Sequence, residues 1–300
     1  MTARRLESSA AVRDITASPG GGPTALRIML GAQLRRLREG KRITLEEAGY
    51  VIRASGSKMS RLETGRVGFK SRDIADLLTL YGVTDVRGRE ALLELARQAS
   101  AMGWWHDYAD VMPTWFQPYV GLEEAASSIR CYEMQCIPDL LQTADYARAI
   151  AVLGHPGRSA DEIERRVSLR MARQAVITRA TPAHLWMVLD EAALRRPVGG
   201  PEVMRRQLRH LMDMAGRPNV SLQVVSLTTA GHAAAGGAFT VLRFSEPDLP
   251  DVVYLEQLTS ALYLDKRDTV DHYMAVLELL CVEALPADGS LKMISGLLDD

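Results

Sequence analysis

The sequence predicts an α+β protein in two parts, an N-terminal all-α domain of five helices and a larger C-terminal mixed α/β domain. Apolar residues recur at helical spacing as far as about residue 100, whereas strand-like runs begin only at residue 184. Charge divides in the same way. Residues 26–72 hold twelve Lys and Arg against four Glu, a net +8, and residues 73–300 hold 21 Lys and Arg against 31 Asp and Glu, a net −10. This asymmetry is expected of a phosphate-binding domain joined to an acidic one.

We therefore expect a disordered tail at 1–23, the all-α domain at 24–102 and the mixed domain at 103–300. The tail is rich in Ala, Ser and Gly and lacks the apolar segment of a signal peptide. Apolar runs elsewhere are too short and interrupted to cross a bilayer. These features predict a cytoplasmic protein without a membrane partner.

The first two helices are indicated by spacing and capping residues. Apolar residues recur along a basic helix, with arginines between them; these are Leu26, Leu30, Leu34, Leu37, Arg35, Arg36 and Arg38. Thr44 then begins a second helix, and Glu47 three residues later completes a capping box. A tight break follows at Arg53 and Ala54.

The third helix has the features of a DNA-recognition helix. Ser55 can cap a short helix over 56–63, and Gly65 stands where a left-handed residue ends a helix. Met59 and Leu62 are its strongly apolar positions, so the opposite face presents Ser57, Lys58 and Arg61. A short helix of this kind fits the major groove of B-DNA. The segment therefore reads as a helix-turn-helix, and the alternative is a basic helical bundle with a solvated charged face.

Residues 26–81 resemble the XRE-type, or Cro/repressor-like, helix-turn-helix domain. The matching strings are 34–38 (LRRLR), 44–48 (TLEEA) and 55–65 (SGSKMSRLETG). Two positions differ, because Leu45 and Gly56 stand where such domains often have Gln. The resemblance implies binding of double-stranded DNA and an internal ion pair between Arg38 and Glu63.

We expect two groups of DNA contacts. Bases are read by Ser57 and Arg61, with Lys58 assisting at the backbone. Ser55 is a further contact at the start of the recognition helix. Phosphates are contacted by four basic residues, Arg35, Arg36, Arg53 and Lys70.

Two more helices, beginning at Ser71 and near Val86, complete the all-α domain and lead into an aromatic cluster. Three of the four tryptophans lie within residues 104–116. Such a cluster either joins two domains or binds a ligand, and we favour the joining role.

The mixed domain is predicted from alternating patterns. Helices are expected at 121–136, 161–179, 202–215 and 269–283, strands at 184–190, 221–227, 239–244 and 252–256, and a turn into a further helix at 137–143.

This region resembles the effector domain of unknown function found in actinobacterial regulators, the WhiJ-like developmental regulators among them. The matching strings are 137–147 (IPDLLQTADYA), 170–174 (RMARQ) and 189–200 (LDEAALRRPVGG), continued by Phe239, Tyr254 and Glu256. Asp139 replaces the usual Gly. The family implies transcriptional regulation, often beside a small partner protein, and fixes no ligand.

Candidate ligand or partner contacts are aromatic, amide and charged side chains of this domain: Trp104, Trp105, Gln142, Tyr146, Arg170, Arg173, Tyr254 and Glu256. Cys131, Cys136 and Cys281 have no zinc-like spacing, and no nucleophile–base pair or phosphate loop is evident, so we expect no metal, no cofactor and no enzymatic activity. The acidic domain then either senses a small molecule or binds a small protein partner. Because one recognition helix covers few base pairs, we also expect a homodimer, held mainly by residues beyond 100.

Overall fold

The computed structural model describes residues 23–65, 67–229, 231–245 and 249–299. They form two compact units, whose main boundary lies between Gly103 and Trp104. The tail expected at 1–23 lies outside the described residues except for Pro23. Within the described residues, no helix combines the length and apolar character needed to cross a bilayer.

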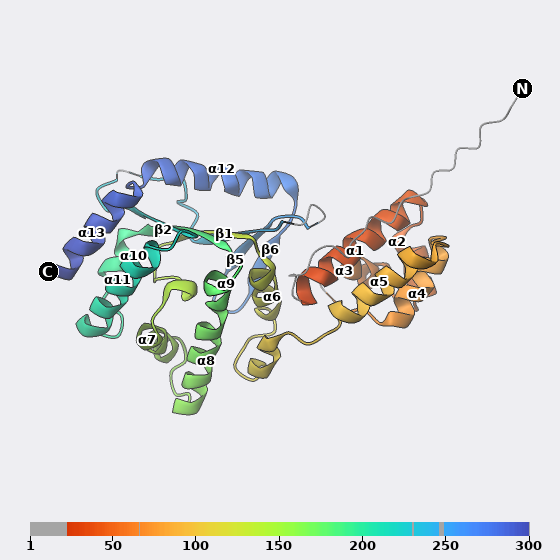
Figure 1. The fold of residues 1–300 in the computed structure, drawn as a ribbon, viewed down its shortest axis with the longest axis horizontal. Coiled ribbons are helices and arrows are strands. Elements are labelled where there is room, and N and C mark those ends of the chain that lie inside the picture. The colour runs from red at the N-terminus through yellow and green to blue at the C-terminus, as the bar shows by residue number, and fades with distance from the viewer. Residues whose placement is uncertain (1–22, 66, 230, 246–248, 300) are drawn as a thin grey trace, which may run out of the picture. The chain divides into compact units, whose positions relative to one another are not determined.

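The first unit contains five helices around one apolar core (Figure 1). They are α1 (Pro23–Gly40), α2 (Leu45–Val51), α3 (Gly56–Glu63), α4 (Ser71–Leu80) and α5 (Val86–Ala99). The core takes at least one apolar side chain from every helix: Leu30 and Leu34 from α1, Ala48 from α2, Met59 and Leu62 from α3, Leu77 and Leu78 from α4, and Leu92 from α5. The all-α five-helix domain is thus present as the apolar spacing indicates.

Local capping fixes the helix ends in this unit. Thr44 and Glu47 form the capping box at α2, because the Thr44 side chain accepts from the Glu47 backbone and the Glu47 side chain accepts from that of Thr44. The Ser55 hydroxyl accepts from the Lys58 N–H at 3.2 Å and begins α3. Gly65, at φ +68°, follows the end of α3 in the left-handed conformation expected of it.

The second unit is built on a six-stranded mixed sheet of order β3-β2-β1-β4-β5-β6. Its strands are β1 (Ser128–Glu133), β2 (His184–Asp190), β3 (Val220–Val225), β4 (Phe239–Arg243), β5 (Val252–Glu256) and β6 (Ala261–Leu264). Strands β1, β2 and β3 are parallel, whereas β4 is antiparallel to β1, and the pairs β4–β5 and β5–β6 are antiparallel too. The protein is therefore of the α+β class.

Helices cover both faces of this sheet (Figure 1). One face carries α12 (Arg267–Glu283), which packs on Tyr132, Val188 and Phe239. The other side carries most of the remaining helices: α6 (Gln117–Ala125), α7 (Ala144–Gly154), α8 (Ala160–Arg173), α9 (Ala175–Thr178) and α11 (Pro201–Ala215). Four shorter or terminal elements complete the described part of the unit: the 3-10 turns η1 (Trp104–Tyr108) and η2 (Asp139–Leu141), and the helices α10 (Glu191–Arg195) and α13 (Ala287–Asp299).

One expected element is wrong. Residues 121–136 do not form one helix, because α6 ends at Ala125 and residues 128–133 form β1 in the middle of the sheet. Ile129, Cys131 and Tyr132 of this strand are buried, and central strands bury both faces. Strand β6 and helix α13 were also not predicted.

Candidate functional site

Helix α3 separates an apolar inner face from a polar outer face. Met59 and Leu62 are buried on the inner side. Ser57 and Arg61, four residues apart and therefore one helical turn from each other, are exposed, and Lys58 is half-buried. The hydroxyl of Ser55 caps the helix and the residue is exposed, so its expected DNA contact stays a prediction.

Helix α3 contacts α1 through backbone at Gly31. A Cβ atom placed on Gly31 would lie 2.5 Å from the carbonyl oxygen of Glu63, far inside van der Waals contact. Any larger residue at this position would therefore push the two helices apart.

A buried ion pair joins the same two helices. The Arg38 guanidinium donates from Nε to Glu63 Oε1 at 2.6 Å and from Nη2 to Oε2 at 2.9 Å. Its Nη1 donates to the Ile43 carbonyl at 2.8 Å, at the turn before α2. Only 10% of the Arg38 side chain and 4% of the Glu63 side chain are exposed. The pair thus ties α1, the α1–α2 turn and the end of α3 together.

The four expected phosphate contacts are exposed and come from three places in the first unit. Arg35 and Arg36 lie on α1, and Arg35 donates to Glu39 at 2.8 Å in an exposed pair. Arg53 lies after α2 in a left-handed backbone conformation, at φ +55°. Lys70 precedes α4, where its side chain makes no capping bond.

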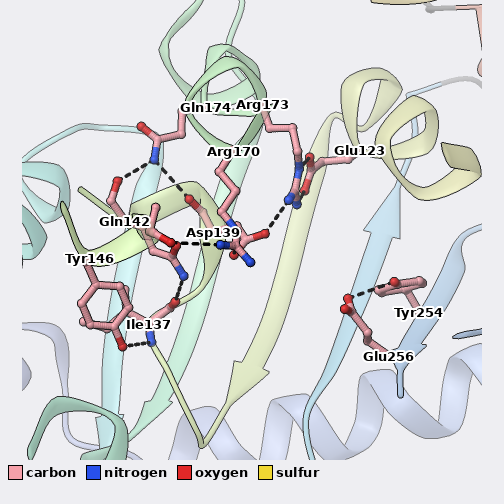
Figure 2. A network of polar contacts seen from close by, with 11 residues as sticks. Glu123, Ile137, Asp139, Gln142, Tyr146, Arg170, Arg173, Gln174, Tyr254 and Glu256 are labelled. Carbon is pink, nitrogen blue, oxygen red and sulfur yellow. Dashed lines mark hydrogen bonds and ion pairs between the residues drawn. The ribbon is translucent and has the colours of Figure 1, made fainter. Parts of the chain in front are cut away.

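In the second unit, Arg173 is the centre of a buried polar network (Figure 2). From α8 it donates to both carboxylate oxygens of Glu123 on α6, at 2.7 and 2.8 Å, and to Asp139 at 2.5 Å. Its guanidinium carbon lies 5.0 Å from the Phe116 ring centre and 5.5 Å from that of Tyr119. One buried guanidinium thus contacts two carboxylates and two aromatic rings.

Asp139, which replaces the usual Gly of the resembled domain, belongs to this network. It lies 3.2 Å from Arg170 Nε in addition to its bond with Arg173. Burial tends to raise the pKa of Asp139, but the two guanidinium groups outweigh it and lower the pKa. The carboxylate therefore stays ionised and links the loop after β1 to α8.

Gln142 and Tyr146 are buried and hold the backbone of the same loop (Figure 2). The Tyr146 hydroxyl accepts from the Ile137 N–H at 3.1 Å, and Gln142 Nε2 donates to the Ile137 carbonyl at 2.6 Å. Gln174 Nε2 donates to the carbonyls of Gln142 and Asp139. These two candidates thus serve the loop structure.

Tyr254 and Glu256 lie on β5. Tyr254 is buried, and the centre of its ring lies 4.1 Å from the centre of the Tyr119 ring. Its hydroxyl donates to Glu256 Oε2 at 3.0 Å. Through Tyr119 this pair is packed beside Arg173. Burial and the neighbouring Asp139 raise the pKa of Glu256.

The carboxyl ends of β1, β2 and β5 all lie at one edge of the sheet, since β5 runs in the same direction as β1. In open sheets this edge is where ligands bind, at the point where the strand order reverses. Glu133 ends β1 there, and burial together with Asp139 and Glu256 raises its pKa to about 8. Burial and Glu133 raise the pKa of the Cys136 thiol to about 12, which favours its protonated form at neutral pH. Among the described residues, no three His, Cys, Asp or Glu side chains are grouped to hold a metal ion.

A pocket of about 240 Å³ opens beside the Arg173 network. It is lined by Trp104, Val120, Glu123, Glu124, Ala172, Arg173, Ala175, Val176 and Arg179. Two of the sequence candidates, Trp104 and Arg173, thus meet here, although they lie far apart in the chain. Trp105 instead is buried in a cluster with Met112, Val120 and Leu169. The two glutamates of α6 had no sequence signal beyond their charge.

Comparison with known proteins finds two families. Residues 29–92 match a helix-turn-helix domain, and residues 116–296 match a domain of unknown function (DUF5753). No curated protein and no solved structure matches the chain. The second match spans more than half of the 300 residues and contains the sheet, the Arg173 network and most of the pocket. The chain therefore belongs to the DUF5753 family, with a helix-turn-helix domain preceding the family's domain.

Proposed function

We propose that this protein is a sequence-specific DNA-binding transcriptional regulator, of the kind that its resemblance to WhiJ-like regulators suggests. The main support is the outward face of α3. Ser57 and Arg61 are exposed one turn apart on a helix whose inner face, cap and buried ion pair fix its position. The surrounding segment is strongly basic, which favours binding to phosphates.

In this proposal Arg61 reads bases and Arg36 contacts phosphates. An Arg that makes two bonds to guanine contributes about 1–3 kcal/mol of discrimination, whereas a phosphate contact chiefly steepens the salt dependence. An operator is first selected from randomised duplexes with the wild-type protein. Arg61→Ala is then expected to relax sequence preference, and Arg36→Ala to weaken all duplexes alike with a flatter salt slope.

Arg97→Ala, which changes an exposed arginine of α5, is the matched control and should leave preference unaltered. If Arg61→Ala changes neither affinity nor preference on the selected operator, α3 is not the recognition helix. If the wild-type protein enriches no sequence from the randomised duplexes, the proposal of sequence-specific binding is rejected as a whole.

We further propose that the second unit senses a small molecule. The supporting observation is the pocket beside Arg173, which has an apolar lining and a few converging charged groups, as ligand sites do. Small molecules that raise the unfolding temperature of the full-length protein are to be tested for their effect on operator affinity. A set of stabilising molecules that never changes operator affinity would contradict this role.

A second candidate function is control by a small partner protein. It is favoured by an open groove of about 500 Å³ between α7 and α11, where Val152 and Leu153 are 53% and 70% exposed. Exposed apolar surface of this kind is typical of protein interfaces. Leu153→Asp should abolish regulation in cells if a partner binds here, while operator affinity of the purified protein stays unchanged. Unaltered regulation would remove this candidate.

A further inference from the structure

The pocket beside Arg173 contains a buried carboxylate oxygen without a hydrogen-bond partner. Glu124 lies on α6, and its Oε2 atom is inaccessible and unpaired within the described part of the chain. The Trp104 indole lies near the same carboxyl group and tends to lower its pKa. Buried polar atoms are nearly always paired, so an unpaired one that lines a cavity indicates a missing donor. Burial raises the pKa of Glu124, and the charge of Arg179 and the Trp104 indole offset this only in part.

The basic residues of the lining direct their hydrogen bonds to groups other than Glu124. Glu123 is fully occupied by Arg173, and Arg173 is shared between Glu123 and Asp139. Arg179 is the remaining basic residue of the lining, and its charge lowers the pKa of Glu124. It is nevertheless exposed, and its Nε donates to the Thr181 carbonyl at 2.9 Å rather than to Glu124. An anionic ligand would therefore meet the unpaired Glu124 oxygen at the inner wall. A ligand that carries a cation would instead supply the missing donor as a charge-assisted hydrogen bond.

The remaining lining suits an aromatic or aliphatic body. Trp104 is half-buried, and Val120, Ala172, Ala175 and Val176 add apolar surface. An indole beside a carboxylate is a favourable place for an ammonium group. The volume of about 240 Å³ corresponds to roughly eight water molecules. It accommodates one ring with a short side chain.

We propose that this pocket binds a small protonated amine, with Glu124 as its counter-ion and Trp104 against its apolar body. The inference rests on the proposed sensing function and names its ligand class. Trp104 is also the first residue of the second unit, directly after the DNA-binding unit in the chain. A ligand held there would contact the first residue after the boundary between the two units.

The test uses the full-length protein labelled with ¹⁵N, in which the four Trp indoles give separate signals. Trp104→Phe identifies the Trp104 signal. Benzylamine is the probe, and benzyl alcohol and benzoate are its neutral and anionic counterparts of similar size. Benzylamine should shift the Trp104 signal saturably, with a Kd of about 1 mM for so small a ligand. The other two compounds, and benzylamine with Glu124→Gln, should bind at least about tenfold more weakly.

Glu278→Gln on α12 is the matched control, because Glu278 is exposed and lies outside the pocket. This variant should bind benzylamine with the same Kd as wild type. Unchanged unfolding temperatures of the variants verify that they are folded. If benzyl alcohol binds as well as benzylamine, or Glu124→Gln leaves binding unchanged, the amine assignment is overturned. If benzylamine binds as described but its saturation leaves operator affinity unchanged, the ligand class stands and the sensing function fails.

Discussion

Removal of the Glu63 carboxylate is the sharpest test of how the first unit is held together. Glu63→Ala leaves the Arg38 guanidinium buried without its bidentate partner. Breaking a buried pair in this way costs about 3–5 kcal/mol of unfolding free energy. Arg38 keeps its bond to the Ile43 carbonyl and has the half-exposed Glu39 carboxylate 3.5 Å away. We therefore expect the lower end of the range, about 3 kcal/mol.

Amide hydrogen exchange in the full-length protein measures this loss locally. The slowest amides of α1 and α3 should exchange about a hundredfold faster in Glu63→Ala, since each 1.4 kcal/mol is a factor of ten. Amides of the second-unit sheet should not change. Unfolding followed by tryptophan fluorescence would miss the effect, because all four tryptophans lie in the second unit.

Arg35→Ala is the matched control on the same helix. It breaks the Arg35–Glu39 pair, whose side chains are 58% and 51% exposed, and should cost only about 0.3–0.5 kcal/mol. A double variant, Arg38→Met with Glu63→Leu, removes both charges and should recover most of the stability. The reasoning is refuted if Glu63→Ala accelerates exchange no more than Arg35→Ala does.

Three further predictions concern capping, pH and assembly. Ser55→Ala should destabilise the first unit by about 1 kcal/mol and Ser55→Gly by only a few tenths, as measured by the same exchange experiment; equal effects would mean that the Lys58 N–H bond is unimportant. The pKa of Glu133 is raised to about 8 in the folded protein against 4.5 in the unfolded chain, so the second unit should lose stability as pH rises from 4.5 to 8. In Glu133→Gln the unfolding temperature should depend less on pH over this range. Parallel pH profiles of wild type and variant would contradict the raised pKa. We propose a homodimer that uses the exposed apolar residues of α12, Leu279 and Val282. Wild type should sediment as a dimer, and the double variant Leu279→Glu, Val282→Glu as a monomer. A monomeric wild type at micromolar concentration would exclude this assembly.

The first unit was largely predictable because its structure is determined by local signals. Thr44, Ser55 and Gly65 mark helix ends through bonds or backbone angles within a few residues of themselves. The burial of Met59 and Leu62 follows from helical spacing alone. The contact between Arg38 and Glu63 is the exception, because these residues lie 25 positions apart. The sequence predicts it only through the resemblance of the segment to a known domain.

The second unit was less predictable because its key features depend on packing between distant segments. Strand β1 follows an Ala- and Glu-containing helix, and its six residues are too few for periodicity to separate strand from helix. Its identity is set by pairing with β2 and β4, which lie more than 50 residues later. Likewise, the pocket brings together Trp104 from η1, Glu124 from α6 and Arg173 from α8. No spacing in the sequence relates these three residues.

The contact at Gly31 has a consequence for how new DNA targets can arise. Helix α3 is positioned by backbone against α1 and by inward side chains, and none of these atoms belongs to Ser57 or Arg61. Substitutions on the outer face therefore leave the scaffold undisturbed, and surface changes of this kind usually alter stability by less than about 0.5 kcal/mol. Under the proposed function, relatives diverge in the operators they recognise through a few outward positions. While the outward positions diverge, Gly31, Arg38 and Glu63 would be retained together, because all three hold α1 and α3 in place.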